Sequence, residues 1–428
     1  MMNSRANRGD FDENFGDGGR VQLRDEAGVA LEVERVLILP SGSILCAAYS
    51  SASATIYLAK LDPNGNLDSR FGVAGLAKFK LSDQFPGMKS ARPFDLKFNE
   101  VGQHIVMGFR AVASNGTLLP GLAKFKAEGV LDSSFGTQGV TCFNYLELLQ
   151  GSDSSLPSSS SSPTEELELS GALVTLDDGS VMLASSQPYE DLYNYAVLAK
   201  VAPDGSLDKG FHQVGFLLLR RNGRHLMRIE SLVQQESKFL LAATTQVSEE
   251  GGWFLQRLDA EGNVDVSFGN NGYYDQQPKV KKSILFRRDL SQIFLIGTSA
   301  NLASQHLFLV TQRRGADGQF DPLYGDQGWT GVLEGNGDIK VFGAQLYNPG
   351  STIVVAAGKF NSQGIGDAVI GTVEQGMGWQ GSFGKEGLVV LTGKNIVHSL
   401  AIQSDRNIVI AASNAGSPAT HEIFRLIG

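Results

Sequence analysis

The residues best suited to chemistry are few, and their spacing forms no recognised site. The sequence contains six histidines: His104, His212, His225, His306, His398 and His421. No two lie within four residues of each other, so neither a His-x-His nor a His-Glu-x-x-His zinc pattern exists. We interpret all six as hydrogen-bonded or solvent-exposed side chains. The sequence therefore predicts no metal site and no cofactor.

Motifs for a nucleophile or a phosphate are also missing. No Gly-x-Ser-x-Gly elbow occurs where a strand would lead into a helix. The stretch Gly335-Asn336-Gly337 lacks the Lys-Ser/Thr of a phosphate loop. Paired carboxylates such as Asp177-Asp178 fall in a turn and are most simply solvated. We identify no catalytic residue, although a set gathered from distant segments would leave no linear motif.

Positive charge gathers in two short segments. Arg220, Arg221, Arg224 and His225 form the first, and Lys279, Lys281 and Lys282 form the second. The chain as a whole is acidic, with a net charge of −9 at pH 7, so these segments are candidates for an anion-binding patch. The alternative is a solvated charge cluster without a ligand. The acidic balance argues against general nucleic-acid binding, because the phosphate backbone attracts basic surfaces.

A calcium loop is the other interpretation that we considered. The residues from Asp62 to Asp68 alternate oxygen-bearing side chains. The glycine at position 65 is misplaced for the calcium pattern, and no glutamate stands at the twelfth position. The equivalent stretch from Lys126 to Asp132 has lost most of the oxygen ligands. We therefore interpret these loops as structural.

Composition indicates a folded, β-rich protein with many tight turns. The chain has 428 residues, of which 42% are hydrophobic, 19% are charged and 51 are glycine, whereas a disordered chain would carry more charge. Cys46 and Cys142 lie in apolar runs, and we expect buried free thiols rather than a disulfide or a reactive site. The first ten residues have no apolar core, and no run approaches the ~18 residues of a membrane helix. We expect a cytoplasmic monomer without a membrane span, with export by a signal-independent route left open.

One phrase, Leu-Asp-x-x-Phe-Gly-x-x-Gly, recurs along the whole chain. The cleanest copies begin at Asp68, Asp132 and Asp265, and another copy opens the chain at Asp12. Three further copies are degenerate, which makes seven. The aromatic positions are Phe15, Phe71, Phe135, Phe211, Phe268, Tyr324 and Phe383, spaced 56 to 76 residues apart. Such a period indicates a repeat architecture.

The stretches between the phrases predict four strands per repeat. After the first phrase, apolar runs at 21–23, 33–39, 44–49 and 56–61 are separated by turn residues, a pattern typical of strands and hairpins. We call them strands a, b, c and d. Seven four-stranded antiparallel units predict an all-β fold, a seven-bladed β-propeller. An open β-solenoid is the alternative, although its repeats are usually shorter.

The two ends of the sequence favour a closed array. The last repeat stops at Gly428 without a phrase, and the chain begins with the missing phrase at residues 10–19. We expect a disordered tail at 1–9 and one propeller domain at 10–428, with the termini as neighbours. The Ser-rich stretch at 151–163 explains the longest spacing and is predicted to be a mobile loop inserted in the third repeat.

The phrase with the residues before it resembles the delta-60 repeat family of bacterial β-propeller-like proteins, whose pattern is Arg/Lys-Leu-x-x-x-Gly-x-Leu-Asp-x-x-Phe-Gly-x-x-Gly. Residues 61–75 and 257–265 match it closely, and the resemblance covers residues 10–428. His212, Tyr324 and Gln380 depart from the pattern. The resemblance implies a propeller and says little about function.

The phrase itself has the composition of a structural element. Its glycines suit turns with positive φ, its aspartate can accept hydrogen bonds from turn amides, and its aromatic ring is expected between adjacent blades. Because the d–a connections carry the phrase, the a–b and c–d connections form the variable face, where binding usually resides. Both basic segments belong to a–b connections, and Tyr189, Tyr193 and Tyr195 flank a c–d connection.

Two functions are compatible with this pattern. The first is a non-enzymatic binding or scaffolding propeller that recognises a protein or carbohydrate partner, including an anionic one, through the variable face. The alternative is a hydrolase or lyase with its site at the mouth of a central channel. An enzyme should gather inward-pointing ionisable side chains with shifted pKa values around one mouth.

Overall fold

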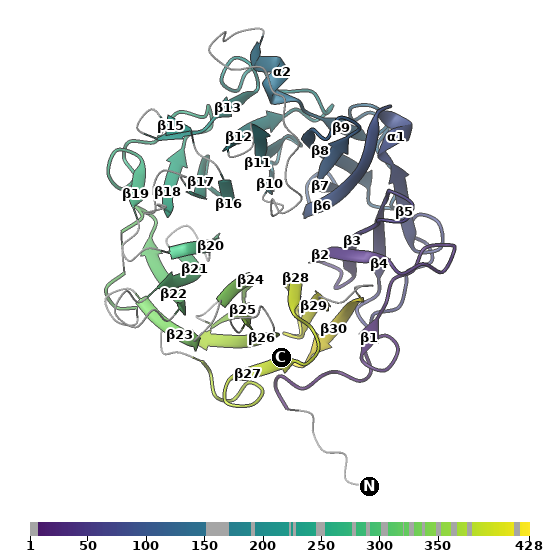
Figure 1. Ribbon diagram of the computed structural model, residues 1–428, viewed down its shortest axis with the longest axis vertical. Coiled ribbons are helices and arrows are strands. Elements are labelled where there is room, and N and C mark those ends of the chain that lie inside the picture. The colour runs from purple at the N-terminus through teal and green to yellow at the C-terminus, as the bar shows by residue number, and fades with distance from the viewer. Residues whose placement is uncertain are drawn as a thin grey trace. The chain divides into compact units, whose positions relative to one another are not determined.

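The computed structural model describes most of the chain. The described residues are 7–150, 171–189, 193–221, 224–225, 228–244, 253–275, 280–287, 292–300, 307–319, 321–324, 329–335, 339–347, 352–360, 366–374, 379–414 and 420–428. They group into two compact units. Figure 1 labels the helices and strands along the chain. One consists of Met1–Cys46, Lys60–Asp68 and Val266–Gly428, and the other of Ala47–Ala59 and Ser69–Asp265.

The described residues form seven four-stranded antiparallel sheets. In sheet order, the first three are β2 (Glu32–Ile38), β3 (Ile44–Ser50), β4 (Thr55–Leu61) and β5 (Leu76–Lys80); β6 (Met88–Asn99), β7 (His104–Ala113), β8 (Leu118–Lys126) and β9 (Val140–Cys142); β10 (Gly171–Thr175), β11 (Val181–Tyr189), β12 (Tyr193–Val201) and β13 (Phe216–Leu218). The next two are β16 (Arg228–Gln235), β17 (Lys238–Thr244), β18 (Trp253–Leu258) and β19 (Tyr273–Asp275); β20 (Val280–Arg287), β21 (Gln292–Ala300), β22 (Leu307–Gly315) and β23 (Trp329–Gly335). The last two are β24 (Ile339–Leu346), β25 (Thr352–Phe360), β26 (Gly366–Glu374) and β27 (Leu388–Leu391); β28 (Ile396–Ile402), β29 (Ile408–Ser413), β30 (His421–Leu426) and β1 (Arg20–Val21).

Three short elements lie between the sheets. They are α1 (Leu81–Gln84), α2 (Tyr145–Gln150) and the two-stranded hairpin of β14 (Arg220–Arg221) and β15 (Arg224–His225). Helices of four and six residues agree with a sequence in which no long segment keeps a helical period. The Ser-rich stretch at 151–163 lies outside the described residues.

The predicted blade, a four-stranded antiparallel sheet, is confirmed, but its boundary lies one strand later than the sequence analysis placed it. The strand that follows each phrase pairs with the strand before the phrase: β5 pairs with β4, and β9 pairs with β8. The phrase is therefore part of a hairpin within one sheet. The reason is that a hairpin satisfies backbone groups locally, whereas the a–b connection leads to the first strand of the next sheet.

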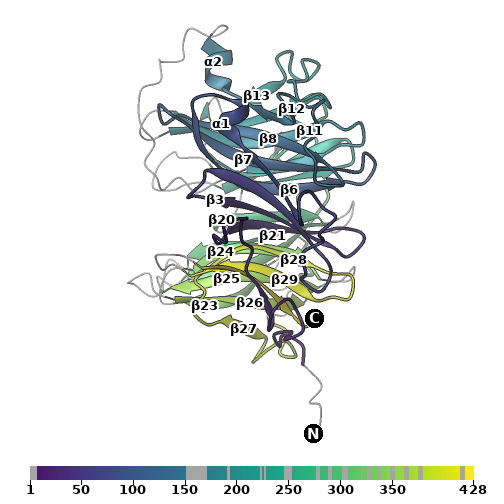
Figure 2. The ribbon, with the colours of Figure 1, turned by 90° about the vertical axis from the view of Figure 1, so that its right-hand side faces the viewer.

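The middle strands of the sheets supply the core. Every residue of β29 is buried, as expected for an aliphatic strand covered on both faces. Between the last two sheets, Val354, Ile370, Ile410 and Phe424 pack into one cluster. Figure 2 shows β24–β26 and β28–β29 stacked against each other. This burial, at roughly 25 cal/mol per Å² of apolar surface, is what holds adjacent sheets together.

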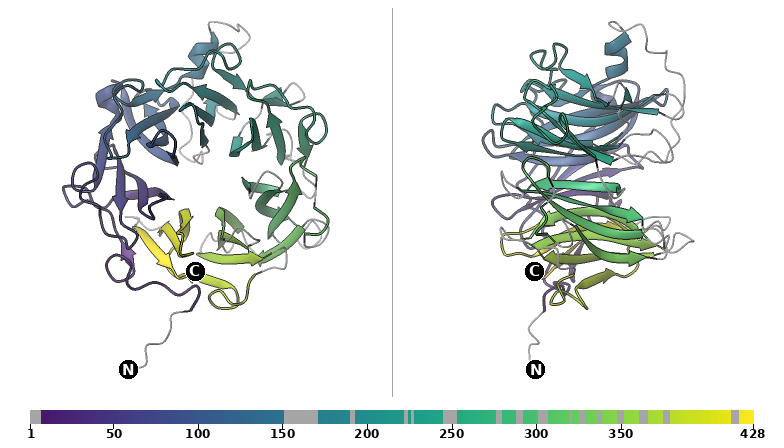
Figure 3. Two further views of the ribbon diagram at one scale, coloured as in Figure 1. Left: turned by 180° about the vertical axis from the view of Figure 1, so that it is seen from behind. Right: turned by 90° about the vertical axis from the view of Figure 1, so that its left-hand side faces the viewer.

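The two ends of the chain meet in one sheet. Arg20 and Val21 of β1 pair with Phe424 and Ile423 of β30, and Figure 3 shows the N-terminal segment beside the C-terminal strands. The amide of Gly9 also donates to the carbonyl oxygen of Ile427 at 2.7 Å. Gly9, which we predicted to lie in the disordered tail, thus makes a backbone hydrogen bond to the C-terminal segment. The expected proximity of the termini is confirmed.

Candidate functional site

Where the structure describes the first residues of a continuous phrase connection, the connection begins with a short turn, which we call the leading turn. In the connection from β4 to β5, the leading turn is Asp62–Gly65 and the phrase is Asp68–Gly75. Asp62 accepts hydrogen bonds from the amides of Asn64 (2.8 Å) and Asn66 (2.9 Å) through the same oxygen. The alternating oxygen side chains that suggested a calcium loop therefore belong to a side-chain-capped turn.

In several described copies, the phrase is joined to the leading turn of the next connection by one backbone hydrogen bond. The amide of Gly72 donates to the carbonyl oxygen of Glu128 (2.7 Å), and the amide of Gly136 donates to that of Asp204 (2.7 Å). The first phrase does the same from Gly16 to Asn64 (2.8 Å). These bonds need the left-handed backbone that glycine adopts without strain, with φ of 56° at Gly72.

The aromatic residue of the phrase packs on the glycine of that next leading turn. All seven aromatic residues are buried, as predicted: Phe15, Phe71, Phe135, Phe211, Phe268, Tyr324 and Phe383. A Cβ atom placed on Gly129 would lie 2.8 Å from the ring of Phe71, and one placed on Gly262 would lie 2.8 Å from the ring of Phe211. Only glycine leaves room for the ring, so the phrase and the leading turn are complementary.

The phrase aspartate pairs with a cation eight residues earlier, a contact that the sequence analysis missed. The pairs are Lys60–Asp68 (3.3 Å), Lys124–Asp132 (3.4 Å), Lys200–Asp208 (2.9 Å) and Arg257–Asp265 (2.6 Å). In the copy that begins at Gln380, both partners differ, and the Thr372 hydroxyl donates to the Gln380 side chain at 3.3 Å. The same aspartates cap the turn as predicted, as when Asp208 accepts from the amide of Gly210.

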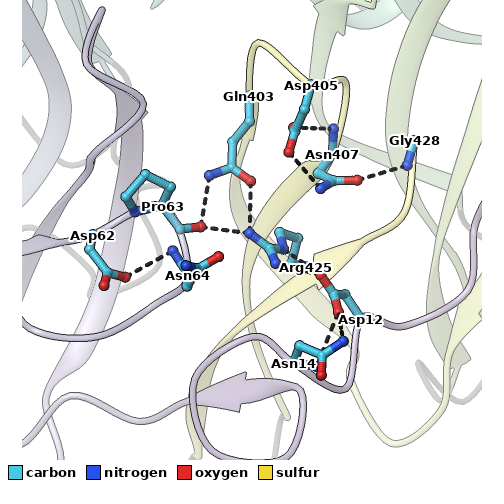
Figure 4. Close-up of polar contacts among 10 residues, drawn as sticks. All are labelled: Asp12, Asn14, Asp62, Pro63, Asn64, Gln403, Asp405, Asn407, Arg425 and Gly428. Atoms are coloured by element: carbon cyan, nitrogen blue, oxygen red, sulfur yellow. Dashed lines mark hydrogen bonds and ion pairs between the residues drawn. The ribbon is translucent and has the colours of Figure 1, made fainter.

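At the chain ends, Arg425 supplies this cation to Asp12 (Figure 4). Its Nε donates to Oδ2 of Asp12 at 2.8 Å, and its Nη1 donates to the carbonyl oxygen of Pro63 at 2.6 Å. Gln403 donates to the same carbonyl at 3.0 Å. Burial raises the pKa of Asp12, but hydrogen bonds from Arg425 and from the Asn14 amide outweigh burial and hold this pKa below its usual 3.8.

Each sheet thus has two chemically different edges, by which we mean the two ends of its strands with the connections that lie there. One edge, here called the phrase edge, carries the phrase connection and the hairpin between the first two strands. The opposite edge, the variable edge, carries the connection between the second and third strands and the connection to the next sheet. This division follows from the antiparallel strand order alone.

A group of ionisable side chains lies at the variable edge where β2 packs beside β28. We call Glu34, His398, Ser413 and His421 the histidine cluster. Nδ1 of His398 lies 3.2 Å from Oε2 of Glu34, and its Nε2 lies 2.7 Å from Oγ of Ser413. The rings of His398 and His421 stack with centroids 4.7 Å apart. Three strands of the last sheet and one strand of the first sheet therefore meet in one polar network.

Two further contacts connect the cluster to β2. Nε2 of His421 lies 3.9 Å from Oε2 of Glu32, and Nη1 of Arg35 donates to the carbonyl oxygen of His398 at 3.0 Å. Burial, followed by the charge on His398, lowers the pKa of His421 below its usual 6.5. Glu34 and His421 are both buried. Such a network is expensive to disrupt, because its members have left water.

A hydroxyl, an imidazole and a carboxylate in series can relay a proton. The order Ser413–His398–Glu34 is that of a nucleophile, a general base and an orienting acid. Ser413 is only 2% exposed, however, which restricts the access of a substrate to its oxygen. No sequence pattern links His398 and His421, which are 23 positions apart. The sequence feature that could have indicated a polar site here is the pair Glu32 and Glu34, which lie two positions apart and therefore on one side of a strand.

The predicted anion patch is only partly described. β14 and β15 contain Arg220, Arg221, Arg224 and His225 and lie in the connection from β13 to β16, at the variable edge. Lys281 and Lys282 belong to β20, and Lys279 lies outside the described residues. The side chains of all seven residues are likewise outside the described part of the chain, so the patch stays a prediction.

The two thiols are free. Burial raises the pKa of Cys46 far above its usual range and that of Cys142 to about 12, so neither is a thiolate at neutral pH. In the part of the chain that the structure describes, no three His, Cys, Asp or Glu side chains are grouped as metal ligands. No helix among the same residues has the length and apolar character that crossing a bilayer requires.

These features define the class: an all-β propeller built from four-stranded antiparallel blades. A family model described as "Domain of unknown function (DUF5122) beta-propeller" matches residues 39–71. This match supports a propeller repeat, while the narrower delta-60 assignment stays a prediction. A search of curated proteins found no match.

Solved structures resemble this chain at low identity. Drosophila Semaphorin 2a is 9% identical, with a TM-score of 0.51 over 100% of this chain and 77% of that chain. A Penicillium chrysogenum alpha-L-arabinanase complexed with arabinobiose is 11% identical, with a TM-score of 0.44 over 80% of this chain and 94% of that chain. The first comparison supports the propeller fold and nothing further.

Proposed function

We propose that this protein is a non-enzymatic binding or scaffolding module that recognises a protein or carbohydrate partner at the variable edge of its blades. We further propose that the blades number seven and form one domain over residues 10–428. The seven phrase copies and the sheet shared by both chain ends support that number. The composition of the variable edge indicates the chemistry of the partner.

The observation that carries the proposal is the contrast in connection lengths. The six continuous phrase connections all have 13 or 14 residues, as from β4 to β5 and from β8 to β9. At the variable edge, the connections between sheets range from 3 residues (β23 to β24) to 28 residues (β9 to β10). Uniform connections that lock one blade to the next serve the fold, and connections that vary on a rigid scaffold are where binding resides.

Two features of the variable edge suggest what it binds. The basic segments at 220–225 and 279–282 belong to connections at this edge, and in an acidic protein they would attract an anionic partner. Tyr189 and Tyr193 are backbone partners in the register of the β11–β12 hairpin. Tyrosines beside a connection are typical of surfaces that contact proteins and sugars.

The test is binding to an array of neutral and sulfated glycans at low and high salt. We expect retention of sulfated glycans that weakens with salt and that is lost in the double variant Lys281→Glu, Lys282→Glu. The matched control is Lys126→Glu, Lys385→Glu, which changes the net charge equally at exposed positions of the phrase edge. Equal binding by both double variants would contradict the anionic-partner assignment. Loss of binding in the control as well would show that net charge alone is responsible.

A hydrolase is the second candidate, and the Ser413–His398–Glu34 relay is the observation that favours it. In that case the Ser413 hydroxyl would attack an ester carbonyl while His398 accepts its proton and returns it to the departing alcohol, and water would then hydrolyse the acyl-serine. Labelling by a fluorophosphonate probe, lost in Ser413→Ala and in His398→Phe, would support this function. Absence of labelling, with full binding activity in Ser413→Ala, would leave the relay a structural network.

A further inference from the structure

We propose that the histidine cluster is an acid-sensitive latch that opens the variable edge between β2 and β28–β30 while the phrase edge stays closed. The proposal does not depend on the proposed function, because it concerns one interface within a single compact unit. It rests on the geometry of two stacked imidazoles placed between two carboxylates on the facing strand.

The latch joins strands that are distant in the sequence. Glu34 on β2 contacts His398 on β28, and the β2 carbonyl of Val33 lies 3.4 Å from Nδ1 of His421 on β30. Ser399 strengthens the same interface, because its hydroxyl accepts from the amide of Val36 at 3.1 Å. Separation of β2 from β28 would break all of these contacts together.

Protonation of both imidazoles would place two positive charges close together inside the cluster. His398 lies 3.2 Å from the Glu34 carboxylate. A second proton on His421 would put two positive rings 4.7 Å apart, and Glu32, at 3.9 Å, is too distant and too exposed to compensate fully. In the open state, water solvates both charges and the repulsion disappears.

The surrounding charges do not remove this asymmetry. Arg35 lies beside Glu34 and adds positive charge, and Lys394 is engaged by Glu422 at 2.7 Å. β24, which packs on the other side of β28, has one charged residue, Lys340, whose side chain lies outside the described part of the chain, and β29 has none. The two imidazoles and the two β2 carboxylates are therefore the ionisable groups gathered at this interface.

The sign of the effect follows from His421. Its pKa is lower in the folded protein than in the unfolded chain, so the stability that it contributes is present above about pH 6.5 and is lost as the pH falls below that value. Asp12, at the phrase edge, has a pKa below 3.8 and keeps its ion pair with Arg425 until more acidic pH. Between about pH 4 and pH 6.5, the variable edge is therefore weakened, while the Asp12–Arg425 ion pair still stabilises the phrase edge.

Hydrogen–deuterium exchange of the full chain at pH 7.5 and pH 5.0, corrected for intrinsic exchange rates, tests the latch. If the closed state excludes the second proton, the opening equilibrium should rise by up to about 30-fold in peptides covering 29–36 and 395–400. Peptides covering 9–16, at the phrase edge, should change by less than about threefold.

The variants His421→Phe and His421→Gln identify the responsible group. Phenylalanine keeps a ring against His398, and glutamine keeps a donor toward Val33, so at least one variant should fold as judged by its thermal transition. Either variant should abolish the acid-induced increase at 29–36. The proposal is overturned if the wild-type increase is absent, if it is equal at both edges, or if it persists in the folded variants.

Discussion

Arg425 and Asp12, which are 413 residues apart in the sequence, form the ion pair that Lys124 and Asp132 form within one hairpin. The backbone follows the same rule, since the amide of Asp12 donates to the carbonyl oxygen of Arg425 just as the amide of Asp132 donates to that of Lys124. The chain ends therefore rebuild a repeat unit that is continuous elsewhere. We call this junction of the two chain ends, with its Arg425–Asp12 pair, the seam. Substitutions of its side chains test how the two ends are held together.

Removal of the arginine should be costly. Arg425→Ala leaves the Asp12 carboxylate buried without its cation, and breaking a buried pair in this way typically costs about 3–5 kcal/mol. Urea unfolding of the variant should show a midpoint that is lower by a corresponding amount. A change below about 1 kcal/mol would mean that water replaces the guanidinium at the seam.

The repeat that contains Thr372 and Gln380 suggests a matched control for Arg425→Ala. Thr372 and Gln380 occupy the positions of the cation and the aspartate and form a neutral hydrogen bond. The double variant Arg425→Thr, Asp12→Gln should therefore be more stable than Arg425→Ala, because no uncompensated charge remains. Equal or lower stability of the double variant would show that the arginine contributes mainly through Pro63.

Acid should weaken the same pair in a defined pH range. The pKa of Asp12 is lowered on folding, so its contribution is present above about pH 3.8 and is lost as the pH falls further. We expect Asp12→Asn to be less stable than the wild type at pH 7 and the difference to shrink by pH 3. Chemical unfolding at both pH values measures it, and a constant difference would contradict the assignment.

Glycines of the leading turns should be intolerant of alanine because of the neighbouring ring. Gly129 has a φ of 86° and lies against Phe71, whereas Gly28 has a φ of 81° with open space around its Cα. Gly28→Ala therefore measures the backbone strain alone, about 1–2 kcal/mol. Gly129→Ala should cost about 1–3 kcal/mol more because the ring must move. Equal unfolding midpoints would show that the ring adapts freely.

The phrase aromatics should contribute as core residues. Phe135 is fully buried, so Phe135→Ala should cost about 3–5 kcal/mol through lost burial and the resulting cavity. Val73, in another phrase, is 76% exposed, and Val73→Ala should change stability by less than about 0.5 kcal/mol. Thermal and urea unfolding of the two variants together test whether the phrase stabilises through its ring.

Deletion of residues 1–23 should destabilise the last sheet. The deletion removes β1, Asp12 and Phe15, which complete the sheet of β28–β30 and the seam. We expect a lower melting temperature and faster amide exchange in 421–428. The deletion of residues 1–6 alone is the control. An unchanged melting curve for the longer deletion would contradict the role of the N-terminal segment in closure.

Much of the architecture is determined by the sequence because it is local. The phrase, its leading turn and the flanking strands lie within about 30 residues, and hairpin hydrogen bonds, positive-φ glycines and aspartate-capped turns depend on nearby positions. His212 illustrates the strength of the pattern, since it adopts a φ of 48° where the other copies have glycine. For the same reason, the four-stranded blade and the burial of the seven aromatic residues could be predicted.

Only the tertiary structure decided which distant residues become neighbours. The sheet boundary after the a–b connection, the Arg425–Asp12 seam and the Glu34–His398 contact all depend on strands that meet across separate repeats. Glu34 and His398 are 364 positions apart and share no motif. Contacts between faces of packed sheets leave no periodic signal in the chain, because they are specified by shape, burial and charge together rather than by spacing.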